Sequence, residues 1–168
     1  MATEIRRSAS NGAGSGLIAG VIFGVMEIVG AAIMGMPPLQ PLRMFASVLL
    51  GGDALRETPL GLAALIGIVV HLVLSAAFGV IYALLNRPLA AKVRTSFSRE
   101  SALGLLYGLV LWVVNVQVIA RFAYSWFLET PQFLQAVMHA VFYGLPLAVM
   151  YVAGERRIHV LRPAPGST

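Results

Sequence analysis

Four long apolar runs, separated by polar and charged segments, dominate the pattern of hydrophobic and polar positions along the chain. A helix needs about 20 apolar residues to cross a bilayer core about 30 Å thick, and each run is that long. The runs predict four transmembrane helices, at about residues 16–36, 59–85, 101–120 and 131–153. We predict an all-α, integral membrane four-helix bundle over residues 16–157, between a flexible N-terminal tail at 1–15 and a flexible C-terminal tail at 158–168.

A shorter apolar segment, residues 41–51, lies between the first two runs. It has a proline at its start and a glycine at its end, which are typical helix boundaries. Because it is too short to span a bilayer, we predict a short interfacial helix here. An apolar loop packed on the bundle is the alternative.

Each of the four runs carries a polar residue near its middle or somewhat outward of it. These residues are Glu27, His71, Asn115 and His139. Exposing such groups to hydrocarbon is costly, so we expect them to face one another inside the bundle.

Glycines at a spacing of four mark the packing faces of the first and third helices. Gly20 and Gly24 share a face with Glu27, and Gly104 and Gly108 lie on a matching stripe of the third helix. Small residues at this spacing let helix backbones approach closely, so we predict that these glycines pack helices together.

Further polar side chains follow the inward faces of the second and fourth helices. Ser75 and Tyr82 lie on the face of His71, and Tyr143 lies on the face of His139. The helical period places them in line with the histidines. We predict one intramembrane polar cluster that contains all of these residues.

The two halves of the chain resemble each other, which predicts an internal repeat of two tandem helical hairpins. The spacing Gly20-xxx-Gly24 returns as Gly104-xxx-Gly108, and the second and fourth helices both open with Glu-Thr-Pro. Independent use of common membrane-helix motifs is the alternative, because both features are frequent.

Composition and charge fit a membrane protein and exclude a nucleic-acid partner. Only 11% of the residues are charged and 58% are hydrophobic, whereas soluble domains have about 25% charged residues. Lysine and arginine concentrate in short segments beside the helices, not on one basic face. Their excess before the first helix, between the second and third, and after the fourth predicts that both termini are cytoplasmic.

The polar cluster has three interpretations. The first is structural, because buried polar residues commonly tie membrane helices together. The second is a proton relay in which Glu27 pairs with His71, since a lone carboxyl in hydrocarbon must stay protonated or find a partner. The third is a haem or metal site that uses Glu27, His71 and His139, because two histidines and a carboxylate can bind iron.

No catalytic motif is present in the sequence. We find no P-loop, no HExxH and no nucleophile elbow, and the chain has no cysteine. We therefore expect a protein that is not an enzyme and that has no resident cofactor.

Several motifs resemble the YagU-like bacterial inner-membrane proteins. They are Gly16-Leu-Ile-Ala-Gly20, the pattern Val70-His71-xxx-Ser75-xx-Phe78-xxx-Tyr82, and a fourth helix with a single histidine that ends in Arg-Arg. The resemblance implies a small four-helix protein of the bacterial cytoplasmic (inner) membrane. The biochemical activity of that group is unknown, and it is loosely associated with survival in acid.

We predict that the protein handles protons or a small solute within the lipid bilayer, alone or as a homo-oligomer. The alternative from another class is an accessory structural subunit of a larger membrane complex. That alternative needs an outward helix face for its partner, which Gln117 and the glycines of the third helix could provide.

Overall fold

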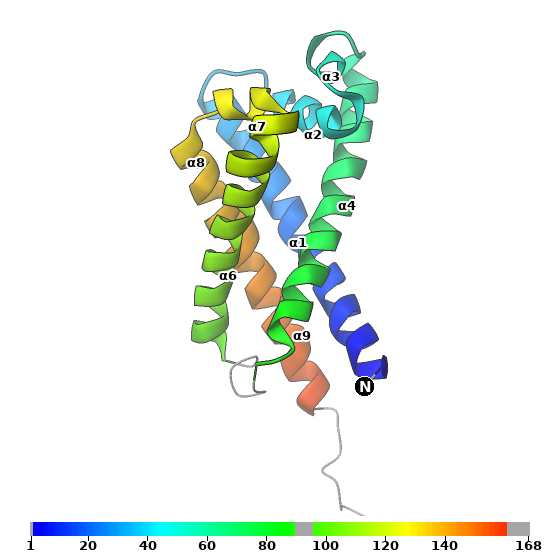
Figure 1. Cartoon of the computed structure of the whole chain (residues 1–168), viewed down its shortest axis with the longest axis vertical. Coiled ribbons are helices and arrows are strands. Elements are labelled where there is room, and N and C mark those ends of the chain that lie inside the picture. Colours follow the sequence, from blue (N-terminus) through cyan, green and yellow to red (C-terminus); the bar gives the residue numbers. More distant parts are fainter. Residues whose placement is uncertain (1, 90–95, 161–168) are drawn as a thin grey trace, which may run out of the picture.

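Four helical segments are long and apolar enough to cross a membrane (Figure 1). The structure, a computed structural model, describes residues 2–89 and 96–160, with side chains up to residue 157. The four segments are Ala2–Ile33, Leu60–Asn86, Phe97–Ala123 and Gln132–Arg157. The described residues form helices and no strands, so the predicted all-α fold is confirmed, and the four apolar segments are those of a multi-pass membrane protein.

Two of the four segments change their helical type along their length. In chain order the elements are α1 (Ala2–Ile33), α2 (Gln40–Leu50), α3 (Asp53–Arg56), α4 (Leu60–Asn86), α6 (Phe97–Trp112), η1 (Val113–Ile119), α7 (Ala120–Ala123), η2 (Ser125–Glu129), α8 (Gln132–Val137), η3 (Met138–Gly144) and α9 (Leu145–Val160). The elements η1 and η3 are π-helical, and η2 is a 3₁₀ turn.

Around the bundle, the neighbouring helices follow one another in the order α4, α1, α9 and α6. Helix α1 packs against α4 on one side and against η3 and α9 on the other, and α6 packs against η3 and α9. Figure 1 shows two distinct ends. We call the end with the start of α1 and the end of α9 the terminal end, and the end with α2, α3 and α7 the α2 end.

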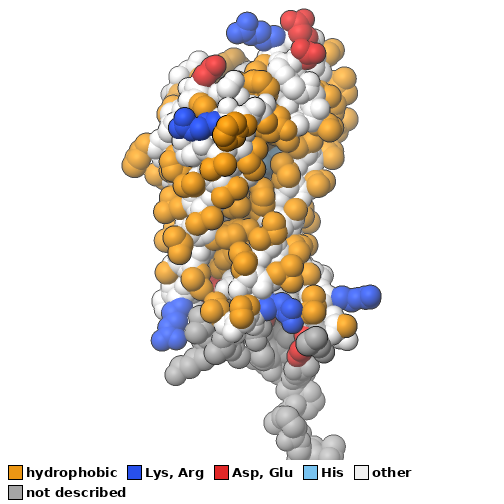
Figure 2. Space-filling view, in the orientation of Figure 1, with side chains coloured by type: hydrophobic (Ala, Val, Ile, Leu, Met, Phe, Trp, Pro, Cys, Tyr) orange, Lys and Arg blue, Asp and Glu red, His pale blue; other side chains and the backbone are white. Residues whose placement is uncertain are grey.

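On the face that Figure 2 shows, apolar side chains cover the middle of the molecule and charged side chains gather at its two ends. This distribution places a hydrocarbon-compatible band between two polar caps, as a spanning protein requires. The short helix α2 lies across the α2 end and packs mainly against α4. Residues 41–51 therefore form a helix rather than a loop.

The predicted flexible tail at residues 1–15 is wrong, because α1 begins at Ala2. Ser8 lies 3.1 Å from the hydroxyl of Tyr151, and Asn11 donates to a Glu155 oxygen at 3.2 Å. The serines, glycines and alanines of this segment suggest flexibility when taken alone. In the bundle they form a small-residue face that lets α1 approach its neighbours. At the other terminus, α9 continues to Val160, and residues 161–168 lie outside the described part.

Glycines set the closest helix contacts in both halves of the chain. A methyl group added at Gly79 of α4 would overlap the carbonyl oxygen of Gly12 and lie 2.8 Å from the Cα of Gly16. In the second half, a methyl group at Gly144 would overlap the carbonyl oxygen of Gly104. It would also lie 3.0 Å from the Cα of Gly108.

The glycines that make equivalent contacts in the two halves are not the pairs that the predicted repeat matches. In the structure, Gly104 and Gly108 occupy the positions that Gly12 and Gly16 occupy in the first half. Gly20 and Gly24 lie further along α1, where Gly20 faces the Ser75 side chain and Gly24 faces the His71 ring. The glycine face of α1 is therefore longer than the predicted span at residues 16–36, which did not include Gly12.

Candidate functional site

A cavity of about 430 Å³ lies inside the bundle, in the half nearest the α2 end. Its walls are largely apolar and come from α1, α2, α4, α6, η1, α7, η2, α8 and η3 and from residues on either side of η2. The residues that line it are Phe23, Glu27, Pro41, Met44, Phe45, Val48, His71, Leu74, Ser75, Phe78, Leu111, Asn115, Val116, Ile119, Ala120, Tyr124, Phe127, Thr130, Gln135, His139 and Tyr143.

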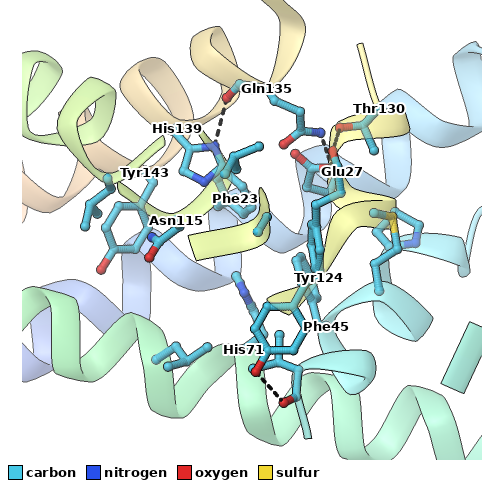
Figure 3. Close-up of a pocket in the computed structure, with 18 of the residues that line it drawn as sticks. Phe23, Glu27, Phe45, His71, Asn115, Tyr124, Thr130, Gln135, His139 and Tyr143 are labelled. Atoms are coloured by element: carbon cyan, nitrogen blue, oxygen red, sulfur yellow. Dashed lines mark hydrogen bonds between the residues drawn. The ribbon is translucent and has the colours of Figure 1, made fainter. Parts of the chain in front are cut away.

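Six of the seven residues of the predicted polar cluster line this cavity. They are Glu27, His71, Ser75, Asn115, His139 and Tyr143. Figure 3 shows five of them, from four different parts of the chain, directed toward a common space. The helical faces deduced from spacing therefore bring these side chains to one place.

Both π-helical segments supply polar side chains to the cavity. Asn115 lies in η1, and His139 and Tyr143 lie in η3. A π turn adds a residue to the helical repeat and changes which side chains face inward, and such turns are frequent at functional sites. Pro146 is the second residue of α9, just after η3, and has no N–H to bond the carbonyl of Phe142, which helps to explain why the regular α-helix is interrupted here.

Each histidine uses one ring nitrogen to hold its orientation. His71 Nε2 lies 2.8 Å from the carbonyl oxygen of Gly20, and His139 Nδ1 lies 2.8 Å from that of Gln135. A carbonyl oxygen only accepts hydrogen bonds, so both of these nitrogens carry a proton. In a neutral ring the other nitrogen, Nδ1 of His71 or Nε2 of His139, is then an acceptor.

Aromatic rings pack on both histidines and fix their positions. Phe45 of α2 stacks on His71 with ring centroids 4.3 Å apart and an interplanar angle of 13°. Phe23 of α1 lies between the two histidines, 5.7 Å from the ring of His71 and 4.8 Å from that of His139. The cavity thus combines flat aromatic surfaces with a few oriented polar atoms.

Glu27 pairs with a residue that the sequence analysis did not single out. Gln135 Nε2 donates to Glu27 Oε2 at 3.1 Å (Figure 3). The other oxygen, Oε1, is buried and has no hydrogen-bond partner among the described residues. The predicted direct pair of Glu27 with His71 does not form, because His71 bonds the α1 backbone at Gly20 instead. Gln135 precedes His139 by four residues, and this helical spacing was the sequence signal for it.

Helix α2 covers the cavity at the α2 end. Tyr124 donates to the carbonyl oxygen of Val48 at 3.2 Å, and Trp126 Nε1 donates to Ser47 Oγ at 2.8 Å. These bonds join α2 to the segment after α7, on the opposite side of the bundle. The apolar face of α2, including Phe45, is thereby held over the cavity.

The cavity opens sideways, between α4 and η1. Leu74 of α4 and Ile119 of η1 both line it, and they are 37% and 45% exposed. Helix α4 does not pack extensively against η1. Toward the terminal end the gap closes, because Tyr107 of α6 donates to the carbonyl oxygen of Phe78 at 2.7 Å. The opening therefore lies where lipid chains surround the bundle.

Tyr82, the seventh predicted residue, lies in a different polar cluster near the terminal end. Its hydroxyl donates to Glu100 Oε1 at 2.9 Å, and Asn86 Nδ2 donates to the same oxygen at 3.0 Å. Glu100 is fully buried, although it precedes the predicted third span. It lies four residues before Gly104 on the packing face of α6, which was the available sequence signal.

Two predictions about partners and metals do not gain support from the geometry. Gln117 donates to Gln132 Oε1 at 2.6 Å within the chain, and Gly104 and Gly108 pack against η3 and α9. The face proposed for a partner subunit is therefore largely used internally. Within residues 2–89 and 96–157, no group of three or more histidine or acidic side chains is arranged to hold a metal ion.

No family model, curated protein or solved structure matches this chain. The resemblance to the YagU-like proteins therefore stays a prediction.

Proposed function

We propose that this membrane protein binds a small amphiphilic molecule that enters the cavity sideways from the bilayer. The lateral opening between Leu74 and Ile119 supports this most directly, because it connects a polar cavity to the lipid-facing surface. This is the small-solute form of the function that the sequence predicts. It involves binding and release, without a catalytic step.

The size and lining of the cavity support the same proposal. Small-molecule sites typically enclose about 300–1,000 Å³, with mostly apolar walls and a few placed polar groups. Here a space of about 430 Å³ has aromatic and aliphatic walls. Most of the polar groups come from α1, α4, η1 and η3, and the others come from α8 and the ends of η2. An amphiphile could direct its polar group toward the histidines and leave its apolar part in the opening.

A tryptophan at the opening tests the proposal. In Leu74→Trp the larger side chain narrows the mouth of the cavity. In the matched control Val73→Trp it points into lipid, since Val73 is 62% exposed and does not line the cavity. We expect native mass spectrometry of gently solubilised protein to detect a retained small molecule in the wild type and in Val73→Trp, and much less in Leu74→Trp. Equal retention by both variants would contradict lateral entry. The same spectra report any partner protein, homo-oligomer or haem.

Proton handling is a second candidate, supported by the position of Glu27. Besides the main cavity, Glu27 lines a smaller one of about 50 Å³. The small cavity also reaches Met34 and Met36, which are 41% and 38% exposed at the α2 end. The carboxyl group thus lies between the main cavity and the outer surface. If proton flux into liposomes is the same for wild type and Glu27→Gln, this candidate is wrong.

We also propose that the terminal end faces the cytoplasm of a bacterial cell. The described arginines of that end are Arg6, Arg7, Arg87, Arg99, Arg156 and Arg157, against Arg43, Arg56 and Arg121 at the α2 end. Basic residues are enriched on the cytoplasmic side of membrane proteins. The chain has no cysteine, so single exposed cysteines report orientation cleanly. A membrane-impermeant maleimide should label Ser125→Cys but not Ser98→Cys in intact cells.

We infer that the two helical hairpins arose by duplication. The support is that Gly79 and Gly144 make equivalent contacts, each against the carbonyl oxygen of one glycine and the Cα of the next on the neighbouring helix. If each hairpin retains this interface, alanine substitution at either glycine should weaken the bundle by a similar amount. Very different effects on unfolding would argue that the two contacts arose independently.

A further inference from the structure

The polar atoms that the cavity leaves without partners are mainly acceptors. His71 Nδ1, His139 Nε2 and Glu27 Oε1 have no hydrogen bond to other described residues. Each of the three accepts a hydrogen bond when the histidines are neutral and the carboxyl is ionised. Asn115 also lines the cavity without a described side-chain bond, and it offers one acceptor and one donor group. A ligand rich in N–H or O–H donors fits this set.

The described side chains that line the cavity include one acidic group, Glu27, and no arginine or lysine. No described basic side chain forms an ion pair with Glu27. Apart from the bond from Gln135, an ionised Glu27 has no described charged partner, which is costly in hydrocarbon, so a bound cation would stabilise it and a bound anion would be repelled.

The aromatic walls also favour a cation. The rings of Phe23, Phe45, Tyr124, Phe127 and Tyr143 all line the cavity. The faces of aromatic rings attract organic cations, and this attraction is greater when water is excluded. The largely apolar walls do not replace the full water shell of a strongly hydrated ion, which favours a cation carried by an apolar body.

Building on the proposed function, we propose that the ligand is an amphiphilic organic amine, bound as its ammonium cation. Its N–H groups donate to the carboxylate of Glu27 and to further acceptors that line the cavity, and its apolar body lies against the aromatic walls. The remainder of the molecule extends through the opening between Leu74 and Ile119 into lipid. No covalent or redox step is involved.

Three probes that share a 4-butylphenyl group and differ in their polar head group test this proposal. The probes are 4-butylbenzylamine, 4-butylbenzyl alcohol and 4-butylbenzoate, which are cationic, neutral and anionic at pH 7. Binding is measured by equilibrium dialysis against the full-length protein in nanodiscs of zwitterionic lipid, with empty nanodiscs subtracted. We expect the amine to bind at least tenfold more tightly than the alcohol and the benzoate not to bind.

Two variants that remove one negative charge show where the selectivity arises. Glu27→Gln should abolish the preference for the amine while binding of the alcohol is retained, which also shows that the variant is folded. The matched control Glu129→Gln removes an exposed carboxyl that does not line the cavity, and it should keep the preference. A preference that survives Glu27→Gln would overturn the inference.

The outcomes separate this inference from the function on which it rests. If the alcohol and the amine bind equally, or if the benzoate binds best, the ammonium inference is wrong while the binding function stands. If no probe binds above the empty nanodiscs and the wild type retains no small molecule, the binding function itself is wrong.

Discussion

Replacing Gly79 by alanine should weaken the bundle at a close crossing of α1 and α4. The new methyl group would overlap the carbonyl oxygen of Gly12 and lie 2.8 Å from the Cα of Gly16. Both of these atoms belong to the backbone of α1, so no flexible side chain can move aside. Carbon atoms in contact lie about 3.5–4.0 Å apart, so α1 and α4 must separate by roughly 1 Å at this crossing.

The size of the effect follows from two opposing terms. Overpacking of a close contact costs typically about 1–3 kcal/mol. Alanine is favoured over glycine within a helix by about 1 kcal/mol, which offsets part of this cost. Gly30 of α1 supplies a matched control, because a methyl group there has no atom within 4 Å. Both substitutions gain the same helix propensity. The difference between the free energies of unfolding of Gly79→Ala and Gly30→Ala therefore measures the cost of overpacking alone, about 1–3 kcal/mol.

The measurement is the free energy of unfolding of wild type, Gly79→Ala and Gly30→Ala in mixed micelles, followed by circular dichroism during titration with a denaturing detergent. We expect Gly30→Ala to be as stable as the wild type or slightly more stable, and Gly79→Ala to be clearly less stable. Equal stability of the two variants would show that α1 and α4 do not meet at Gly79 as described. The packing argument would then fail for the whole first hairpin.

Two further predictions concern the polar contacts at the two ends of the bundle. Tyr82→Phe removes the hydroxyl that donates to buried Glu100, and we expect the free energy of unfolding to fall by about 1–2 kcal/mol in the same titration. An unchanged value would mean that this bond does not stabilise the terminal end. Trp126→Phe removes the bond to Ser47 that holds α2 over the cavity. Backbone amides of α2 should then exchange hydrogen faster, as measured by mass spectrometry, while those of α1 stay unchanged.

The fold class was predictable because membrane spans leave a strong pattern in the sequence. Hydrocarbon requires long continuous apolar helices, so composition alone marks them. The N-terminal segment was missed for a related reason. Residues 2–15 are rich in small and polar residues, and their helix is stabilised by contacts with α4 and α9 rather than by apolar composition. A pattern within one segment does not contain those contacts.

The sequence predicted most residues of the candidate site but not the hydrogen bonds that they form. Helical spacing placed His71, Asn115 and His139 on inward faces, and the cost of burying polar groups brought them together. The partner of Glu27 depended on the rotation of α8 and η3, which a π turn changes locally. Spacing at a uniform helical period does not predict such turns. The sequence also did not reveal that α2 covers the cavity, because this position depends on bonds from Tyr124 and Trp126, which are distant in the chain.

The contrast between the two halves of the bundle explains how a cavity can persist inside it. Near the terminal end, glycine contacts and the bonds around Glu100 hold all four helices together. Toward the α2 end, α4 and η1 do not pack closely, and Phe45 and Tyr124 cover the space from outside. The closed half fixes where the helices begin to diverge. An amphiphilic molecule that fills the open half then needs no rearrangement of the bundle, which is the arrangement expected of a preformed binding site.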